Sequence, residues 1–476
     1  MFKKETIVFC FFPFKGVYYT PVDLGYIVGL MEKKGVDKYK IEIISHPLSF
    51  YDNERDIRDG IGGCVESIIS KKPKAVFFFA DNINWSSIYA FERASKIANE
   101  LKKINSFLFV GLQSYKIHPG HIEKNYRQKI FDCLVLDDPE NSFLSIDQIL
   151  NKRYVEGVTY CEAGSGGKSG SFDTVGRKNI TEGNFLDHIP SPYLGGFFDD
   201  YLSSEMRKND NDFTAFLYSS RGCKFGCFYC FRSIKYEQFR FFSAKRFYDE
   251  IEYIYKKFGI GRFFVLDDAF VFSKERIERF IEEYDKRKEK TDLDNIRLFV
   301  CARPEQLDEE MLQLLRKINV VWIQVGLQTV NPGLQNYMLR SNEMKKFQEI
   351  ALIAKNNNIK LLVDVILGLP YDTIDFFKKT IDFAISLGPR TIQVKQLYHC
   401  PGTRFFAEKK KYGLVPENME KDFFLPYVKE AAGLDRSYYK EAFDYLMEKA
   451  ESNKGMRWKI MTREGILISK DSNFIF

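Results

Sequence analysis

Two successive series of alternating strand and helix patterns constrain the fold of this 476-residue chain more than any other feature. The first series has five apolar strand patterns, separated by segments with helical spacing: Thr6–Phe12, Lys40–Ser45, Lys74–Ala80, Phe107–Gly111 and Phe131–Leu136. Strands that alternate with helices favour a parallel, doubly wound sheet, in which ligands bind beyond the carboxyl ends of the strands. We therefore expect residues 1–150 to form a Rossmann-like domain.

The second series has six strand patterns: Phe213–Ser219, Arg262–Asp267, Ile296–Ala302, Val320–Leu327, Lys360–Leu367 and Thr391–Leu397. Six such units are too few for a closed eight-stranded barrel but suit an open, partial (β/α)6 barrel over residues 213–415. Residues 416–476 are predicted to form a mostly helical C-terminal extension that ends in a short hairpin. The fold class is therefore α/β.

The segment between the two series, residues 151–212, differs in composition. Its stretch "EAGSGGKSGSFDTVGRKN" is too poor in apolar residues to support a core. The prolines of "DHIPSPYLGGFFDD" favour an extended path. We expect a linker and a crossover between domains.

Charge and hydropathy exclude several kinds of partner. The net charge of +6 comes from 71 basic and 65 acidic residues without a basic block, so nucleic acid is not an expected partner. No stretch has the length of a membrane span. The apolar run Ile7–Phe14 contains Pro13 and lacks a small-residue cleavage site, which favours a buried strand over a signal peptide. We expect a cytoplasmic protein, in which cysteines are more often ligands or core residues than disulfides.

The stretch "SSRGCKFGCFYCFRS" places Cys223, Cys227 and Cys230 within eight residues. Thiolates suit zinc or an iron–sulfur cluster. A structural zinc site needs four ligands, but no second Cys-x-x-Cys and no paired histidine motif accompanies the three cysteines. Three local thiolates predict a four-iron cluster with one iron open to a substrate or cofactor. A zinc loop or a chance cluster is the alternative.

This spacing, with Tyr229 before the last cysteine, resembles the signature of radical S-adenosylmethionine (SAM) enzymes. The resemblance implies a 4Fe-4S cluster whose open iron is chelated by SAM. It also implies reductive cleavage of SAM to a 5′-deoxyadenosyl radical, which abstracts hydrogen from an unactivated carbon. Five further segments resemble the second to sixth strands of that family: "FFVLDDAF", "CARPEQLDEEMLQLL", "IQVGLQTVNP", "VDVILGLPYDT" and "IQVKQLYHCPGT".

The resemblance also implies which side chains hold SAM: Tyr229, Asp267, Asp268, Arg303 and Gln328. A planar guanidinium suits the carboxylate of SAM, and an aspartate suits its ammonium or ribose hydroxyls. The alternatives are that Asp268 caps a turn, that Arg303 pairs with a neighbouring acid, and that Asp364 only stabilises the barrel. His399 and Cys400 are candidates for a direct role at the substrate, against a structural histidine and a core cysteine.

The N-terminal series resembles the cobalamin-binding domain found in one branch of that superfamily. The resemblance rests on "PVDLGYIVGLMEKKG", "FLFVGLQSYKIHPGHI", "CLVLDDPENSFLSI" and "IPSPYLGGFFD", and it implies that Gly111 and Gln113 lie near cobalamin. Leu112 departs from the family, which often has a second glycine there, and adds bulk where a cofactor would approach. Asp137-Asp138-Pro139-Glu140 stands in place of Gly-Glu-Gly-Glu, and the Asp-x-His-x-x-Gly fingerprint of other cobalamin proteins is absent.

Three functions are therefore compared. The first is a radical SAM enzyme that methylates an unactivated carbon with the help of cobalamin. The second is a radical SAM enzyme without cobalamin that carries out another step, such as peptide crosslinking, cyclisation, epimerisation or aminocarboxypropyl transfer. The third is a non-catalytic iron–sulfur or zinc sensor. Either enzyme would act on a small molecule or a peptide and would take electrons from a flavodoxin or ferredoxin.

Overall fold

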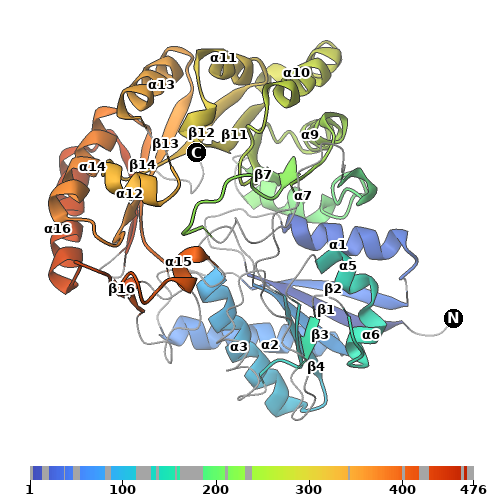
Figure 1. Cartoon of the computed structure of the whole chain (residues 1–476). Helices are drawn as coiled ribbons and strands as arrows, with labels where there is room; N and C mark the ends of the chain where they lie inside the picture. The colour runs from blue at the N-terminus through green and yellow to red at the C-terminus, as the bar shows by residue number, and fades with distance from the viewer. Residues whose placement is uncertain are drawn as a thin grey trace. The chain divides into compact units, whose positions relative to one another are not determined.

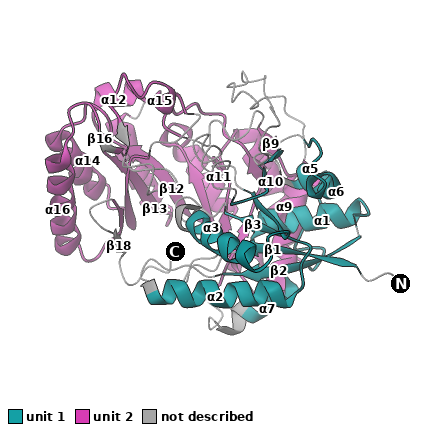
Figure 2. Cartoon of the chain, turned by 90° about the horizontal axis from the view of Figure 1, so that it is seen from below, with its two compact units in different colours: residues 1–173, 188–208 teal, residues 174–187, 209–476 magenta. Residues whose placement is uncertain are grey.

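The computed structural model describes residues 4–12, 21–36, 38–46, 54–80, 87–113, 130–135, 139–155, 158–160, 186–208, 213–230, 239–340, 343–398, 403–416, 428–462 and 466–468. The chain divides into two compact units (Figure 2). The first unit holds residues 1–173 and 188–208, and the second holds residues 174–187 and 209–476. Most of the predicted crossover thus belongs to the first unit.

The first unit contains a six-stranded sheet with the order β2-β1-β3-β4-β5-β6 (Figure 1). Its strands are β1 (Glu5–Phe11), β2 (Tyr39–Ser45), β3 (Ala75–Phe79), β4 (Phe109–Gln113), β5 (Cys133–Val135) and β6 (Val158–Tyr160). The five predicted strands pair in parallel, which confirms the doubly wound sheet. Strand β6 pairs antiparallel with β5 and was not predicted, because it has only three residues and lies in the expected linker.

The helices of the first unit are α1 (Val22–Lys33), α2 (Glu54–Ser70), α3 (Ser87–Ile104), α5 (Pro139–Leu144), α6 (Ile146–Leu150) and α7 (Asp199–Lys208). Helix α1 packs directly on the crossover. A Cβ on Gly25 would lie 2.4 Å from Pro192 and 2.8 Å from the Phe198 ring, so glycine is required at this contact. The core of the sheet is aromatic, with Phe77 and Phe143 at a ring-centroid distance of 5.0 Å.

The second unit contains an eight-stranded sheet with the order β18-β17-β14-β13-β12-β11-β10-β7. The strands are β7 (Thr214–Leu217), β10 (Arg262–Val265), β11 (Arg297–Ala302), β12 (Val320–Gln328), β13 (Lys360–Leu367), β14 (Thr391–Gln396), β17 (Arg457–Met461) and β18 (Ile466–Ile468). All six predicted strands are present and parallel. Two small antiparallel pairs lie beside the sheet: β8 (Ser220–Arg221) with β9 (Arg240–Phe241), and β15 (Val415–Pro416) with β16 (Val428–Glu430).

The terminal hairpin, β17 and β18, was predicted, but its place in the main sheet was not. Strand β17 pairs in parallel with β14 and adds a seventh parallel strand to the partial barrel. The sequence of β17, "RWKIM", alternates polar and apolar residues. Such alternation is typical of a half-exposed antiparallel strand, whereas parallel strands usually read as continuous apolar runs.

The helices of the second unit are α9 (Ala244–Phe258), α10 (Lys274–Lys288), α11 (Glu309–Lys317), α12 (Pro332–Tyr337), α13 (Met344–Asn356), α14 (Ile374–Ser386), α15 (Arg404–Ala407) and α16 (Arg436–Ser452), with 3-10 turns at Leu293–Asn295 and Pro304–Gln306. A further 3-10 turn, Leu186–His188, includes residues of both units. Side-chain caps fix where several begin: Ser243 accepts from Arg246 N at 3.1 Å, and Asp308 accepts from Met311 N at 2.8 Å. Each such cap contributes about 1 kcal/mol. None of the described helices is long and apolar enough to cross a membrane.

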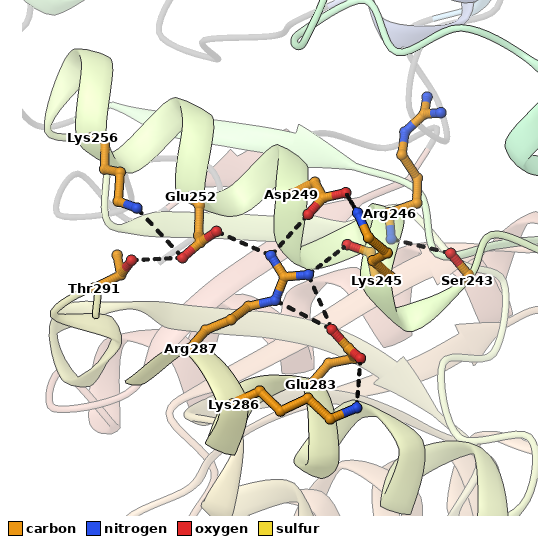
Figure 3. Close-up of polar contacts among 10 residues, drawn as sticks. All are labelled: Ser243, Lys245, Arg246, Asp249, Glu252, Lys256, Glu283, Lys286, Arg287 and Thr291. Carbon is orange, nitrogen blue, oxygen red and sulfur yellow. Dashed lines mark hydrogen bonds and ion pairs between the residues drawn. The ribbon is translucent and has the colours of Figure 1, made fainter. Parts of the chain in front are cut away.

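Helices α9, α10, α11, α13, α14 and α16 cover one face of this sheet (Figure 1). The strand residues on that face are apolar and fully buried, including Val363, Val394 and Trp458. We call the opposite face the inner face. Within the helical layer, Arg287 of α10 bridges to α9 through Asp249 at 2.8 Å and Glu252 at 3.0 Å (Figure 3). The two helices are thus joined by ion pairs as well as by apolar packing.

Candidate functional site

The three-cysteine loop follows β7, and a buried carboxylate at the end of β10 holds its beginning. Asp267 accepts hydrogen bonds from the backbone N–H groups of Ser219 and Ser220 at 2.7 and 2.9 Å. It also accepts from their hydroxyls at 2.5 and 2.6 Å. Burial raises the pKa of Asp267, while Arg276 and the two serines oppose the rise. The carboxylate therefore fixes the first turn of the loop against the neighbouring strand.

Arg276, on the first turn of α10, completes this buried network. Its guanidinium donates to the Ser219 carbonyl at 3.0 Å and to the Ser219 hydroxyl at 2.7 Å. A third bond, from Nη1, reaches the Phe270 carbonyl at 2.9 Å, and Nη2 lies 3.8 Å from Asp267 Oδ2. Burial lowers the pKa of Arg276 to about 10, and Asp267 opposes this shift. Sequence reasoning missed Arg276, because a helical arginine more often faces solvent.

Two guanidinium groups approach the sulfur of Cys227. Arg303 Nη1 lies 3.6 Å from Sγ, and Arg340 Nη1 lies 3.8 Å from it. Arg303 also pairs with Glu305, as the alternative interpretation expected, with Nε 3.0 Å from Oε2. The two guanidiniums therefore place positive charge beside this sulfur.

Arg340 links the loop to the end of β12. It donates to the Gly326 carbonyl at 2.6 Å and to the Tyr229 hydroxyl at 3.3 Å. Burial opposes the charge of Arg340, but Tyr229, Cys227 and Glu305 together raise its pKa above the ordinary value. Arg340 was not predicted, because a single arginine after a short helix gives no sequence signal.

The backbone at the end of β12 is shaped around Gln328. This residue has φ +66°, in the left-handed region, and its side chain is buried. A Cβ on Gly326 would lie 2.2 Å from Gln328 Nε2 and 3.2 Å from Arg340 Nη2. Gly326 therefore leaves the space that the Gln328 amide and the Arg340 guanidinium occupy.

Two further residues of the loop, Lys224 and Phe228, fasten it to its surroundings. Lys224 donates to the Phe272 carbonyl at 2.6 Å. Phe228 packs against Tyr337 and Phe405 at ring-centroid distances of 4.8 and 5.3 Å, and its carbonyl accepts from Phe405 N at 3.2 Å. The loop is therefore held by β10, α10, α12 and α15.

Three other residues singled out in the sequence, Tyr229, Asp268 and Asp364, lie in the described part of the second unit. Burial raises the pKa of Tyr229, and Asp268 is half-buried beside Asp267. Asp364 accepts from Gln324 at 2.6 Å and from Gln393 at 2.5 Å, which agrees with a role in the barrel. His399 and Cys400 lie outside the described residues.

Gly111 and Gln113, the residues expected near cobalamin, lie in the first unit on β4. A Cβ on Gly111 would lie 2.4 Å from the Phe77 ring and 3.0 Å from Cys133 Sγ, so neighbouring strands already fill the space beside this glycine. Gln113 is buried at the end of the strand. Residues 114–129, which follow β4, and Asp137-Asp138 lie outside the described residues.

Three cysteine sulfurs are the donors that an iron–sulfur cluster would bind in this loop. Among the described residues, no group of three or more His, Cys, Asp or Glu side chains is arranged to hold a metal ion. The three cysteines share one loop, with Cys227 buried and Cys223 and Cys230 half-buried. Their chemistry fits a cluster, since three local thiolates beside two guanidiniums suit iron and sulfide. Because the described residues form no ready-made metal site, the assignment of the three cysteines as ligands stays a prediction.

Comparison with known proteins agrees with this architecture. Residues 217–384 match the family model of the Radical SAM superfamily. "Uncharacterized methyltransferase PH0819" of Pyrococcus horikoshii is 23% identical over 67% of this chain and 66% of its own length. "Anaerobic magnesium-protoporphyrin IX monomethyl ester cyclase" of Rubrivivax gelatinosus is 23% identical over 78% of this chain and 62% of its own length. The chain thus spans slightly less than two thirds of each relative.

Two solved structures share the fold of both units. The radical SAM methyltransferase TsrM from Kitasatospora setae, with tryptophan and a SAM analogue bound, aligns with a TM-score of 0.64 at 16% identity, over 86% of this chain and 77% of its own. The cobalamin-dependent SAM radical enzyme OxsB, with aqua-cobalamin and SAM bound, aligns with a TM-score of 0.63 at 15% identity, over 95% of this chain and 67% of its own. At these identities the likeness establishes the fold.

Proposed function

Because the chain belongs to the radical SAM superfamily, we propose that Cys223, Cys227 and Cys230 hold a 4Fe-4S cluster at which SAM is cleaved. When bound, such a cluster would supply the single electron for reductive cleavage of SAM, which would release methionine and provide a 5′-deoxyadenosyl radical for hydrogen abstraction. The observation that carries the proposal is the loop itself, which follows the first parallel strand of the barrel and sets Cys227 beside two guanidiniums.

The chain's own residues then have distinct tasks. Asp267 and Arg276 fix the start of the loop through Ser219. Arg303 and Arg340 stabilise negative charge on the Cys227 sulfur. Asp268, which follows β10, and Gln328, the last residue of β12, remain our candidates for contacts with SAM. The apolar packing around Phe228 keeps water from that side of the loop.

For the reaction on the substrate, we propose cobalamin-dependent methylation of an unactivated carbon. Support comes from the parallel sheet of the first unit, from the shared fold with TsrM and OxsB, and from the relative named a methyltransferase. Cobalamin would lie beyond the carboxyl ends of that sheet, where doubly wound folds bind ligands. The substrate would be a small molecule or a peptide, and the reductant a flavodoxin or ferredoxin in the cytoplasm.

The cluster is tested by anaerobic reconstitution with iron and sulfide. We expect about four irons per chain, an EPR signal that changes when SAM is added, and 5′-deoxyadenosine after reduction with dithionite. The Cys227→Ala variant should lose the iron, the change of the EPR signal with SAM and the formation of 5′-deoxyadenosine. Cys64→Ala, which removes a thiol of the first unit, keeps them. A chain that binds a single zinc ion, or a signal indifferent to SAM, contradicts the proposal and favours a sensor.

A second candidate, radical chemistry without cobalamin, is favoured by the filled space beside Gly111 and by the bulk of Leu112. The protein purified with hydroxocobalamin decides between the two. Corrin absorption that stays with the protein after gel filtration supports methyl transfer. Only the broad absorption of the cluster, with 5′-deoxyadenosine still formed, favours another radical step.

A further inference from the structure

Two cysteines of the first unit lie in direct contact inside the fold. The sulfur atoms of Cys10, on β1, and Cys64, on α2, are 4.0 Å apart. Both are free thiols; Cys10 has no exposed surface, and Cys64 is 6% exposed. The sulfurs of a disulfide lie about 2 Å apart, so a shift of about 2 Å by one side chain would bring the two within bonding distance.

An imidazole completes this group. His46 directly follows β2, and its backbone N–H donates to the carbonyl of Phe11, the neighbour of Cys10, at 2.9 Å. A Cβ on Gly60, one helical turn before Cys64, would lie 3.2 Å from His46 Cε1. The His46 side chain is buried, and its Nε2 has no hydrogen-bond partner among the described residues. Such a nitrogen can accept a proton from a neighbouring thiol.

The two thiols differ in acidity. Burial is the main cause that raises the pKa of Cys10 well above its usual value. The bond with Cys10 lowers the pKa of Cys64; burial opposes this shift, and His46 lowers the pKa further. The thiolate is the nucleophilic form of cysteine, so Cys64 is the attacking sulfur and Cys10 is the thiol that reacts second.

The helix that carries Cys64 is weak just before this residue. Gly60, Gly62 and Gly63 precede Cys64 within α2. A Cβ on Gly62 or Gly63 would meet no atom within 4 Å, so packing does not require glycine at these two positions. Glycine inside a helix lowers its stability relative to alanine. Local opening of this part of α2 would expose Cys64 to a small solute.

We propose that Cys64 and Cys10 form a peroxide-reactive dithiol, with His46 as the base that takes the proton of Cys64. The Cys64 sulfur attacks one oxygen of hydrogen peroxide, the O–O bond breaks, and water leaves with the proton that His46 held. The Cys10 sulfur then attacks the sulfenic acid at Cys64, the S–O bond breaks, and a second water leaves as the disulfide forms. The two thiols are oxidised by two electrons in all, and the peroxide is reduced.

The inference goes beyond the proposed function and does not depend on it. Two thiols and one imidazole fall short of the four ligands of a structural zinc site, which favours redox chemistry. Cys10 is one residue from the end of β1, at the edge where doubly wound sheets bind ligands. The disulfide would therefore tie α2 to the ligand-binding edge of the first unit.

The test is differential alkylation and peptide mass spectrometry of the full chain, treated with hydrogen peroxide in the absence of oxygen. We expect a disulfide between the peptides that contain Cys10 and Cys64, and we expect dithiothreitol to reverse it. The peptides report each cysteine separately, so oxidation of the cysteine loop in the second unit does not obscure the result.

Four variants assign the roles. Cys10→Ala should stop the reaction at the Cys64 sulfenic acid, which dimedone traps. His46→Gln should slow the oxidation at neutral pH by about a hundredfold and move its pH dependence upward, because the base is lost. Gly63→Ala should slow it about fivefold, since alanine makes the helix open less often. Cys133→Ala, which removes another buried thiol of the first unit, serves as control and leaves the disulfide unchanged.

The proposal is overturned if Cys64 stays reduced, if it pairs with a cysteine other than Cys10, or if a bound zinc ion protects both thiols. An unchanged rate in His46→Gln or in Gly63→Ala removes the base or the opening of α2 from the proposal. If Cys10→Ala does not fold, Cys64→Ala decides the order of attack, because Cys10 should then stay reduced. A chain that forms the disulfide but fails to cleave SAM would withdraw the radical chemistry and keep the dithiol.

Discussion

Helix α10 carries one arginine at each end, and the two lie in opposite electrostatic situations. Arg276 is buried and meets one carboxylate, at 3.8 Å, together with the backbone carbonyls of Ser219 and Phe270. Arg287 is partly exposed and lies within 3.0 Å of carboxylates from Asp249, Glu252 and Glu283 (Figure 3). The richer ion-pair network is thus on the outer surface, and the sparser one is at the site.

The two arginines differ in the number of their ion pairs because solvent reaches Arg287 but not Arg276. On the outer surface, water and salt screen each pair, so many pairs are needed for a modest gain. Inside, a single pair with matched hydrogen bonds fixes a loop, and the loss of one partner leaves a buried charge without compensation. The number of ion pairs is therefore a poor guide to which arginine matters for function.

The largest effect is expected from Asp267→Ala. The change removes the carboxylate that lies beside the buried Arg276 guanidinium. It also leaves the N–H and O–H groups of Ser219 and Ser220 without their acceptor. Together these losses should lower the free energy of unfolding by about 3–5 kcal/mol. Urea unfolding of the apo-protein measures this loss, and the iron content after reconstitution falls with it. The double variant with Arg276→Leu should recover part of the stability. A loss below about 1 kcal/mol would show that the buried Asp267–Arg276 pair contributes no more than the partly exposed ion pairs of Arg287.

Arg340→Met should cost about 2–3 kcal/mol, because a charged donor to the buried Gly326 carbonyl is removed. The reduction potential of the reconstituted cluster should also fall, since positive charge near a cluster sulfur favours the reduced state. An EPR-monitored redox titration measures the potential. Arg316→Leu, on the outer helix α11, serves as control and leaves it unchanged. An unaltered potential in Arg340→Met would separate Arg340 from the cluster.

Lys459 should give the second unit a distinctive pH dependence. Its pKa is about 7 when folded and near 10.4 when unfolded, so between these values the unfolded chain binds one more proton. The free energy of unfolding of the wild type should therefore rise with pH, relative to Lys459→Met, by about 1.4 kcal/mol per pH unit. Denaturant unfolding of both proteins across this range gives the difference. If the difference in free energy of unfolding between the two proteins does not change with pH, Lys459 stays charged in the folded protein.

The smallest effect is expected from Arg287→Leu. Its partners are partly exposed, so the loss should be about 1 kcal/mol or less and should shrink further in high salt. Iron content and SAM cleavage should equal those of the wild type. A loss comparable to that of Asp267→Ala would remove the contrast between the two ends of α10.

Much of the fold could be predicted because its strands are apolar runs separated by helical patterns. "KAVFFFA" and "LLVDVIL" form buried parallel strands as expected. Strand β17 could not be assigned to the barrel, because its pairing with β14 joins segments separated by α16 and depends on packing rather than on local pattern.

The site was predicted less completely than the fold. The cysteine spacing indicates the loop, and the strand ends indicate Asp267, Arg303 and Gln328. The sequence does not show that Asp267 is engaged by Ser219 and Ser220, since those bonds depend on the three-dimensional register of β7 and β10. Arg340 comes close to Cys227 only through the chain reversal after α12.

The late position of β17 has a consequence for biosynthesis. Until residues 457–461 leave the ribosome, the nascent chain presents β14 as an open edge, with unpaired backbone groups that invite association with other chains. Pairing of β17 closes that edge and brings Lys459 beside Gln393 in one step. Truncation before β17 would therefore remove a protective strand and the buried Lys459 together.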